Sequence, residues 1–338
     1  MSPSEPMGDE PDHGNEVAVK RVLVTGASGF VGRSVVEALA EADGVEVVST
    51  DLRVPAVRDR RARVDYRKLD ICEPGMDALF AELGVDVVVH LAAIVTPGPH
   101  MTREMQRRVD VDGTRNVLDA CVAAGVKRFV YTSSGAAYGY HPDASPLLDE
   151  DDPLRGNDVF AYACHKREVE EMLAEYREQQ AELEQVIFRV STVLGPDVTN
   201  QITAMFERPV VMGIAGSETP FCFIAAEDVA ECIVRGAMGA PAGVFNLTGD
   251  GVMTLREIAV AMHRRYLELP EKLVQGALEV LSRFGLSPYG PEQTIFLKYR
   301  PVLNNERLKT VFGYRPRLDT RQAFERYRAS RDVGHTHA

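Results

Sequence analysis

Short apolar runs alternate with segments of helical periodicity along the first half of the chain. The runs occupy residues 21–25, 45–49, 85–91 and 129–133, and amphipathic helices are expected over 30–42, 75–83 and 105–124. Runs such as VDVVV at 85–89 are almost continuously apolar, which is typical of parallel strands buried on both faces. The pattern predicts an α/β fold built on a doubly wound parallel sheet with right-handed crossovers.

Helical periodicity continues in the second half of the chain. A long helix is expected over 160–184 and a further one over 272–284. The apolar residues of the second helix recur at helical spacing, namely Leu273, Val274, Ala277, Leu278 and Leu281. We interpret this stripe as part of the core, and the alternative is that it roofs an apolar substrate pocket.

Composition places the chain among ordinary globular proteins. It has 338 residues, of which 45% are apolar and 26% charged, enough for a large α/β core. The formal net charge of -12, without a dominating Lys/Arg block, argues against affinity for nucleic acid or an anionic membrane. No apolar stretch is long enough to span a bilayer. Five scattered cysteines without ligand spacing predict reduced thiols, a cytoplasmic location and no metal site.

Three glycines at three-residue spacing follow the first apolar run. In VLVTGASGFVG, which covers 22–32, they are Gly26, Gly29 and Gly32. They permit a tight turn at the strand end, backbone contact with a pyrophosphate, and close packing of the next helix. The phosphates of a dinucleotide then lie at the helix N-terminus. Because the pattern alone also describes a plain glycine-rich turn, a dinucleotide site requires support from residues further along the chain.

An acidic residue at the end of the second apolar run supports a dinucleotide site. Asp51 comes about 20 residues after the last glycine, where a carboxylate accepts hydrogen bonds from ribose hydroxyls. Because a carboxylate repels a 2′-phosphate, we predict NAD in preference to NADP. Arg53 argues the other way, since a guanidinium there could turn toward a 2′-phosphate.

The reactive groups are expected at the end of the strand at 129–133 and on the helix after it. Ser134 stands at the C-terminal strand end, the edge where open α/β sheets bind ligands. Tyr162 and Lys166 are four residues apart, so they share a helix face and the ammonium favours the ionised phenol. An unperturbed tyrosine has a pKa of about 10, too high for efficient proton transfer at neutral pH. A chance Tyr-x-x-x-Lys spacing is common, but the order of parts here is the one that hydride transfer to a carbonyl requires.

With these residues in place, the chain resembles the extended short-chain dehydrogenase/reductase superfamily, in particular its NAD-dependent epimerase/dehydratase group. The resemblance runs from about residue 20 to 316. Besides the glycines, its landmarks are LDI at 69–71, HLAA at 90–93, GTRNV at 113–117, TSSGAAYG at 132–139, YACHK at 162–166, GP at 195–196, FIAAEDVA at 223–230 and FGYRP at 312–316. It implies a Rossmann-type doubly wound fold that binds NAD.

The resemblance also implies roles for individual residues. Tyr162 is implied as the catalytic acid/base, Lys166 as the residue that binds the nicotinamide ribose and tunes Tyr162, and Ser134 as the hydrogen-bonding partner of the reacting oxygen. The implied cofactor-binding set comprises Gly26, Ser28, Gly29, Phe30, Val31, Gly32, Asp51, Leu52, Arg53, Asp70, Ile71, Leu91, Ala92, Ala93, Thr132, Ser133, Tyr162, Lys166, Ser191 and Val193.

Two lobes are expected along the chain. Residues 1–16 are acidic and rich in Pro and Gly without an apolar segment, so they predict a disordered leader rather than a signal peptide. The NAD-binding Rossmann domain is expected over 17–197, with a returning segment at 222–249. A smaller, discontinuous substrate lobe is expected from 198–221 and 250–330, followed by a tail at 331–338.

Several polar residues near these motifs need separate interpretation. The family commonly has Asn where Asp110 stands, which puts a proton relay through that position in doubt, although a carboxylate can still orient a lysine or a water. His165 adjoins Lys166 but faces another way on the helix, so we assign it no chemistry. His90 is interpreted as a strand-end residue that packs under the cofactor loop, and the acidic run at 149–152 as a solvated loop.

Residues that related enzymes carry and this chain lacks reduce the number of reactions to consider. Dehydratases of the group carry an Asp-Glu pair after the strand-end Thr, where this chain has Gly135 and Ala136, so dehydration is not expected. Nucleotide-sugar enzymes usually present an arginine just before the segment at 223–228, where this chain reads TPFC at 219–222. Arg208 or Arg300 could substitute for that arginine.

We therefore predict an NAD(H)-dependent oxidoreductase that transfers hydride between nicotinamide and a carbonyl or alcohol carbon of a small molecule. A nucleotide-sugar 4-epimerase with tightly retained NAD is the alternative, and a non-enzymatic NAD sensor is a more distant one. The helices near 105–124 and 160–184 lie where relatives build a dimer interface, so we expect a homodimer without nucleic-acid or membrane partners.

Overall fold

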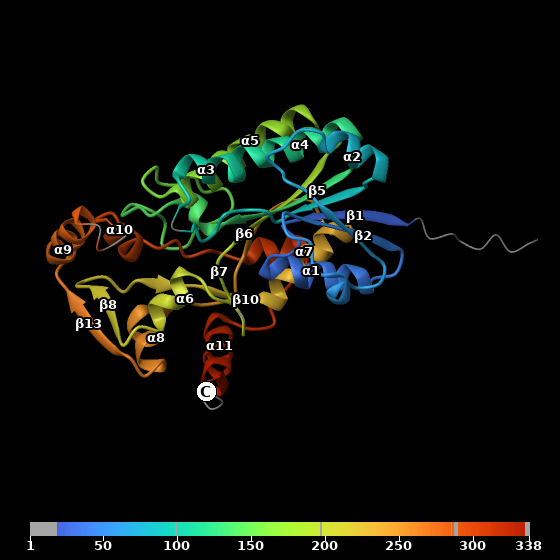
Figure 1. Cartoon of the computed structure of the whole chain (residues 1–338). Coiled ribbons are helices and arrows are strands. Elements are labelled where there is room, and N and C mark those ends of the chain that lie inside the picture. The colour runs from blue at the N-terminus through green and yellow to red at the C-terminus, as the bar shows by residue number, and fades with distance from the viewer. Residues whose placement is uncertain (1–18, 99, 197, 285, 287–289, 335–338) are drawn as a thin grey trace, which may run out of the picture.

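A seven-stranded parallel sheet forms the centre of the larger lobe (Figure 1). The computed structural model describes residues 19–334 apart from 99, 197, 285 and 287–289, so the leader expected at 1–16 lies outside the described residues. The strand order is β11-β6-β5-β4-β1-β2-β3, and every neighbouring pair is parallel. The winding reverses between β1 and β4, which is where doubly wound sheets bind ligands. The predicted fold class is confirmed.

The elements of this lobe show the predicted alternation of strands and helices. The strands are β1 (Lys20–Thr25), β2 (Val45–Asp51), β3 (Val64–Lys68), β4 (Val87–His90), β5 (Arg128–Ser134), β6 (Glu184–Val190) and β11 (Gly243–Leu247). The α-helices are α1 (Phe30–Glu41), α2 (Met76–Leu83), α3 (Arg103–Arg107), α4 (Gly113–Ala124), α5 (Ala161–Gln179) and α7 (Ala226–Met238).

Helices cover both faces of the sheet. In Figure 1, α2, α4 and α5 lie on one face, and α1 and α7 on the other. Alternate residues of β1 serve the two faces, because Val22 and Val24 belong to one apolar cluster and Leu23 to the second. Burial on both faces is the physical reason why the strands read as continuous apolar runs.

The smaller lobe is assembled from segments before and after α7. It contains β7 (Thr192–Leu194), α6 (Gln201–Phe206), β8 (Val210–Ile214), β9 (Pro220–Phe221), β10 (Phe223–Ala225), β12 (Met253–Thr254), α8 (Leu255–Ala261), β13 (Arg265–Leu269), α9 (Glu271–Arg283), α10 (Gln293–Lys298) and α11 (Thr320–Gly334). Its core is built on packed aromatic rings of Phe206, Phe221, Phe223 and Phe324. Leu308 and Phe312, in a π-helical turn, pack instead against the large sheet.

The helix predicted over 105–124 forms without interruption from α3 through α4, with a π-helical turn (Arg108–Asp112) inside it that the periodicity does not reveal. The helix expected to reach 184 ends at Gln179, because the chain must turn at 180–183 to enter β6. Helical periodicity continues past such a helix end, so it does not locate it.

The interpretation of the 272–284 stripe as core is wrong. The helix forms as α9, but Leu273 and Leu281 of the stripe are 58% and 40% exposed, and none of the α9 residues is buried. The side of α9 that faces the protein carries the partly exposed Val274 and Leu278. On the same side Gln275 donates to the Thr294 hydroxyl at 3.1 Å and Glu271 accepts from Lys298 at 2.9 Å. Periodicity reveals that one face is apolar, but not whether anything covers that face.

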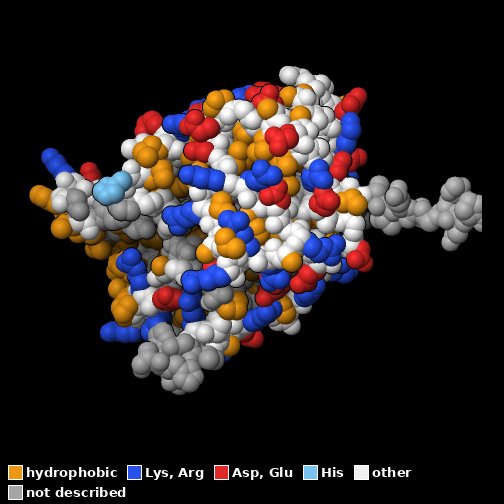
Figure 2. All heavy atoms as spheres, turned by 45° about the vertical axis from the view of Figure 1, so that its right-hand side comes forward, with side chains coloured by type: hydrophobic (Ala, Val, Ile, Leu, Met, Phe, Trp, Pro, Cys, Tyr) orange, Lys and Arg blue, Asp and Glu red, His pale blue; other side chains and the backbone are white. Residues whose placement is uncertain are grey.

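Charges of both signs are interspersed over the face of the molecule seen in Figure 2, without a block of Lys and Arg. Among the described residues, none of the helices is sufficiently long and apolar to cross a bilayer. The cytoplasmic location stays a prediction.

Candidate active site

The glycine loop joins β1 to α1 at the reversal point of the sheet. Gly26 has φ +65°, and a Cβ there would lie 2.6 Å from the Ala92 backbone nitrogen. A Cβ on Gly32 would lie 2.4 Å from the Gly26 carbonyl oxygen. Both contacts are far too short for a real side chain, so the tight turn and the close helix packing require glycine. The N-cap residue of α1, Gly29, has no capping side chain, which leaves this helix end open to phosphate groups.

Asp51 connects the end of β2 to the glycine loop. Its Oδ2 accepts a hydrogen bond from the Ser28 backbone N–H at 3.0 Å, and its Oδ1 accepts one from the Arg53 N–H at 3.1 Å. The Ser28 hydroxyl in turn donates to the Arg53 carbonyl at 2.6 Å. The carboxylate is therefore fixed beside the loop, where it suits an adenosine ribose, while the side chains of Leu52 and Arg53 are exposed.

The other predicted cofactor residues line the same strand edge. The loop Leu91–Ala93 meets the glycine loop, since Leu91 N–H donates to the Thr25 carbonyl at 3.2 Å and Ala92 faces Gly26. Asp70 caps the turn at Ile71, whose carbonyl accepts from Asn116 at 2.9 Å. Further along the sheet, Ser191 N–H donates to the Leu247 carbonyl at 3.0 Å, and Val193 lies on β7. Ser133 is not turned to that edge: its hydroxyl hydrogen-bonds the buried Glu170 carboxylate.

Ser134, Tyr162 and Lys166 meet where β5 ends against α5. Ser134 closes β5, and its Oγ accepts from the Ala136 N–H at 3.1 Å. It is near enough to Tyr162 to lower the pKa of the phenol. Lys166 lies one helical turn after Tyr162, with its Nζ 5.7 Å from the centre of the Tyr162 ring. The lysine is buried and donates to the Tyr131 hydroxyl at 2.9 Å and to the Thr132 carbonyl at 2.8 Å.

Burial controls the protonation of this trio. It lowers the pKa of Lys166 to about 8, against the opposing effect of the Asp110 and Glu170 carboxylates. Burial also raises the pKa of Tyr162 above its ordinary value, while the hydrogen bond from Ser134 lowers it and the charge of Asp110 raises it further. The protein by itself therefore keeps the phenol protonated, as a proton donor to a carbonyl must be.

An aromatic wall that the sequence does not predict faces Tyr162. Tyr140 packs edge-on against Phe160 and Phe296, with ring centres 5.3 and 5.1 Å apart. Tyr162 itself packs against the same cluster. Phe296 comes from α10, far beyond Tyr162 in the sequence, so no local pattern signals the contact. The side chains packed beside Tyr162 are therefore mainly aromatic and apolar.

Arg300 borders this wall. Its guanidinium lies 4.1 Å from the Phe221 ring centre and 4.6 Å from that of Phe296, and Nη2 donates to the Thr192 hydroxyl at 3.4 Å. Its buried Nε and Nη1 atoms have no partner among the described residues. A buried guanidinium with unused donors is suited to an anionic ligand. Arg208, the other substitute considered from the sequence, has an exposed side chain.

Asp110 and His165 form a buried pair beside the trio. The Asp110 carboxylate accepts from the Ile94 N–H at 2.8 Å through Oδ1, and its Oδ2 lies 3.1 Å from Nδ1 of His165. The relative exposures of the two side chains are 4% and 1%. His165 thus points inward, away from the Tyr162 face as expected, but toward a carboxylate 55 residues earlier in the chain.

His90 fills the space beneath the cofactor loop. Its Nε2 hydrogen-bonds the Thr114 hydroxyl at 3.0 Å and its Nδ1 the Thr25 hydroxyl at 2.6 Å. Burial, together with the smaller effect of the nearby Lys166 charge, lowers the pKa of His90 to about 3. The ring is therefore neutral and packed at the end of β4, as expected for a residue beneath the cofactor loop.

The acidic run at 149–152 contacts later segments of the chain, so its interpretation as a solvated loop fits the exposed Asp149 and Asp151 but is wrong for Glu150. Glu150 is buried and accepts from the Asn246 N–H at 2.7 Å. Arg307 pairs with both Glu150 and Asp151, and Asn304 donates to Asp149 at 2.7 Å. Carboxylates occupied in this way have little capacity left for a cation.

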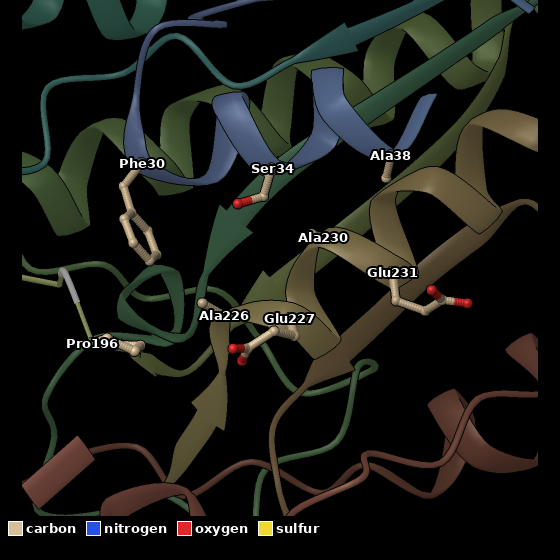
Figure 3. A pocket seen from close by; sticks show the side chains of 8 residues that line it. All are labelled: Phe30, Ser34, Ala38, Pro196, Ala226, Glu227, Ala230 and Glu231. Carbon is tan, nitrogen blue, oxygen red and sulfur yellow. The ribbon is translucent and has the colours of Figure 1, made fainter. Parts of the chain in front are cut away.

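A groove separate from these residues lies between α1 and α7 (Figure 3). Phe30 points toward Pro196 and Ala226 at one end of it. Its two carboxylates already have partners, since Glu227 pairs with Arg326 and Glu231 with Arg235. None of the trio lines it, so we do not regard it as the reacting pocket.

A model of the NAD dependent epimerase/dehydratase family matches residues 22–247. The chain belongs to this family. Over 319 residues it is 32% identical to a UDP-glucose 4-epimerase of Mycolicibacterium smegmatis, covering 88% of this chain and 94% of that one. Over 147 residues it is 43% identical to a 3-beta-hydroxysteroid dehydrogenase of Mycolicibacterium neoaurum, covering 42% and 37%. A UDP-glucose 4-epimerase of Thermus thermophilus, solved in complex with NAD, has a TM-score of 0.69 at 24% identity, covering 92% and 98%.

Membership of the NAD dependent epimerase/dehydratase family confirms the resemblance, the prediction of an enzyme and the predicted cofactor, NAD. The described residues fit that cofactor, because the glycine turn admits no side chain, the α1 N-terminus is uncapped and Asp51 is fixed beside it. The roles of the individual residues and the substrate stay predictions.

Proposed function

We propose that this chain interconverts a secondary alcohol and a ketone of an apolar, non-nucleotide small molecule, with NAD(H) as the redox partner. The observation that carries the proposal is the convergence of Ser134, Tyr162 and Lys166 at one strand edge, opposite an aromatic wall. The dehydrogenase from Mycolicibacterium neoaurum, whose name gives a hydroxysteroid as its substrate, supports an apolar alcohol.

NAD, when bound, supplies the acceptor or donor of the hydride. The N-terminus of α1 would hold its pyrophosphate, and Asp51 its adenosine ribose. Lys166, already anchored by Tyr131 and Thr132, would donate to the nicotinamide ribose. These contacts would place the nicotinamide near Tyr162, and the protein would then supply orientation and a proton.

Tyr162 moves that proton. In the direction of reduction its phenol, held protonated by burial, donates to the substrate oxygen while Ser134 hydrogen-bonds the same oxygen. In the direction of oxidation the phenolate must accept the proton, and the ammonium of Lys166 on the same helix face favours that ionised form. Ser134 keeps the oxygen in line with Tyr162 in both directions.

The aromatic wall indicates which substrates fit. Phe160 and Phe296, which are partly exposed and packed on the buried Tyr140, offer ring surface, so burying an apolar substrate skeleton is favourable by roughly 25 cal/mol per Å². A hydroxyl or carbonyl is the one polar group that Ser134 and Tyr162 can satisfy, which makes a single secondary alcohol on an apolar skeleton the best match.

The test is turnover of a panel of apolar secondary alcohols with NAD⁺, measured through the absorbance of the NADH formed. Tyr162→Phe should lose roughly a hundredfold to ten-thousandfold in rate while it still binds NADH. Tyr176→Phe, on the same helix but hydrogen-bonded to Asp119, is the matched control and should remain active. Equal activity of Tyr162→Phe and the unmodified enzyme would contradict the proposed role.

A nucleotide-sugar 4-epimerase is the second candidate, favoured by the unpartnered donors of Arg300 among the described residues. The relative from Mycolicibacterium smegmatis, which is named a UDP-glucose 4-epimerase, supports it over most of the chain. Denaturing the purified protein and identifying any released nucleotide separates the two candidates. Near-stoichiometric NAD together with conversion of UDP-glucose to UDP-galactose would favour the epimerase, whereas an empty protein that binds NADH reversibly would favour the dehydrogenase.

We further propose a homodimer formed through α4 and α5. The two helices run along one flank, where Val122 is 36% exposed and Tyr176 reaches across to Asp119. Sedimentation velocity at micromolar concentration should give the mass of two chains. A single species of 37.2 kDa would remove the dimer.

A further inference from the structure

Asp110 occupies an unusual backbone position between the cofactor loop and the helix of the reacting groups. It lies in the π-helical turn between α3 and α4, and such turns are frequent at functional sites. Its carboxylate binds Ile94, the residue directly after the loop Leu91–Ala93, and His165, the residue directly before Lys166. A single side chain thus connects two segments that both border the predicted nicotinamide site.

The charge of this carboxylate is not cancelled by its neighbour. His165 has its Nδ1 directed at Asp110, while its buried Nε2 has no partner among the described residues. An imidazolium would leave a buried N–H at Nε2 unsatisfied, whereas a neutral ring with its proton on Nδ1 leaves only a lone pair there. The hydrogen-bond geometry therefore favours a neutral His165 and a pair that carries a net negative charge.

The field of Asp110 reaches the reacting groups. Its charge raises the pKa of Lys166, of Tyr162 and of Tyr131, three side chains from two elements that surround the site. An asparagine, the residue that the family commonly has here, would accept the Ile94 hydrogen bond equally well but would carry no charge. Asp110 therefore adds electrostatics, not merely a structural hydrogen bond.

We propose that the Asp110–His165 pair makes this chain bind the oxidised cofactor in preference to the reduced one. The nicotinamide ring is cationic in NAD⁺ and neutral in NADH, so a fixed buried anion nearby stabilises the first form directly, whereas its effect through the charge of Lys166 acts on both forms. The inference rests on the proposed function, because it requires the nicotinamide to lie beside Tyr162 and Lys166. It goes beyond that function because it assigns the preference for one redox form of the cofactor to two residues outside the Ser-Tyr-Lys trio.

The experiment compares dissociation constants of NAD⁺ and NADH for the full chain by calorimetry, with NADH fluorescence as a second readout. Asp110→Asn should raise the ratio Kd(NAD⁺)/Kd(NADH) on the order of tenfold, because it removes one charge in a poorly screened site. Asp112→Asn, on the same π-helical turn but exposed and paired with Arg107, is the matched control and should leave the ratio unchanged. Asp110→Glu, which retains the charge, should retain the preference for NAD⁺.

Each outcome is decisive. Should Asp110→Asn fail to fold, the double variant Asp110→Asn with His165→Ser removes the same charge together with the buried ring. It should raise the ratio Kd(NAD⁺)/Kd(NADH) in the same way. Equal weakening of both nucleotides by Asp110→Asn would mean a purely structural role through Ile94 and overturns the inference while the proposed function stands. Failure of the unmodified protein to bind either nucleotide would overturn the proposed function itself.

Discussion

The ammonium group of Lys166 donates a hydrogen bond to the Tyr131 hydroxyl at 2.9 Å, while the same nitrogen lies 5.7 Å from the centre of the Tyr162 ring. A second hydrogen bond to the Thr132 carbonyl at 2.8 Å completes its attachment to β5. Because burial lowers the pKa of Lys166 to about 8, the lysine is held in position while its charge titrates just above neutral pH.

Nucleotide affinity should therefore depend on pH in a defined direction. Lys166 is charged below about pH 8 and neutral above it, so NADH affinity should fall as the pH rises through 8, since the ammonium group near the ribose and phosphates is lost. NADH fluorescence titrations on both sides of this pH measure the effect. Lys166→Met should bind weakly with no such dependence, and the same dependence in this variant would assign the titration to another group.

Removing the Tyr131 hydroxyl should move this titration. Tyr131→Phe deletes an acceptor that stabilises the ammonium form of Lys166, so the pKa of the lysine should fall further and the loss of NADH affinity should begin at lower pH. The same pH series on this variant detects the displacement. An unchanged midpoint would show that the hydrogen bond to Tyr131 does not contribute to the charge of Lys166.

Asp51 should decide between NAD and NADP. Its carboxylate is fixed by Ser28 and Arg53 beside the glycine loop, and it repels a 2′-phosphate. Asp51→Ala should weaken NAD⁺ binding and strengthen NADP⁺ binding. Without the Asp51 carboxylate, nothing at this position repels a 2′-phosphate, and Arg53 is free to bind it. Calorimetry with both nucleotides tests this, with Asp59→Ala, a carboxylate in an exposed turn, as the control. A variant that loses NAD⁺ without any gain for NADP⁺ would limit Asp51 to holding the loop.

His90 should make the fold sensitive to acid. Its pKa is about 3 in the folded protein against 6.5 for an ordinary histidine, so its contribution to stability is present above 6.5 and is lost as the pH falls to 3. At about 1.4 kcal/mol per unit, the free energy of unfolding should fall by up to roughly 5 kcal/mol across that interval.

Urea unfolding at several pH values measures this loss in the unmodified protein and in the two variants His90→Asn and His263→Asn. His90→Asn should be less stable at neutral pH but should show a shallower decline with acid. His263→Asn is the control, because His263 is exposed with φ +55°, a conformation that asparagine accepts. If the free energy of unfolding falls equally with acid in the unmodified protein and in His90→Asn, another group causes the acid sensitivity.

Two glycine substitutions should separate cofactor binding from stability. Gly32→Ala places a Cβ 2.4 Å from the Gly26 carbonyl and should abolish nucleotide binding, because the glycine turn must open. Gly125 follows α4 with φ +70°, and a Cβ built there would meet no atom within 4 Å. Gly125→Ala should therefore cost about 1 kcal/mol of stability and leave nucleotide binding intact. Thermal melts with and without NADH report both quantities. Retained affinity in Gly32→Ala would show that the loop tolerates a side chain.

Local sterics and burial explain which features the sequence predicts well. The positive φ of Gly26 and the contact between Gly32 and the Gly26 carbonyl are local, so the glycine pattern is visible along the chain, whereas the Ala92 backbone that closes on Gly26 comes from a distant segment. The parallel sheet is visible because Val22, Leu23 and Val24 are all buried, and burial on both faces requires apolar residues at successive positions. The spacing of Tyr162 and Lys166 on one helix results from helical geometry alone.

Other features depend on contacts between distant segments. Asp110 meets His165 across 55 residues, and neither the π-helical turn nor an inward-facing histidine next to Lys166 has a local signal. Arg300 contacts the ring of Phe221 only because α10 returns to the aromatic wall. Glu150 is buried because Asn246 and Arg307 come to it from later parts of the chain.

The sequence alone determines the doubly wound sheet, the glycine turn and the order of Ser134, Tyr162 and Lys166. These features depend on local geometry and on burial, which produces a periodic pattern of apolar residues. Packing between distant segments was needed to pair Asp110 with His165, to bring Phe296 to Tyr140 and to leave Leu273 and Leu281 of α9 exposed. Periodicity records which residues share a face, whereas the partner of that face is set by where the rest of the chain packs.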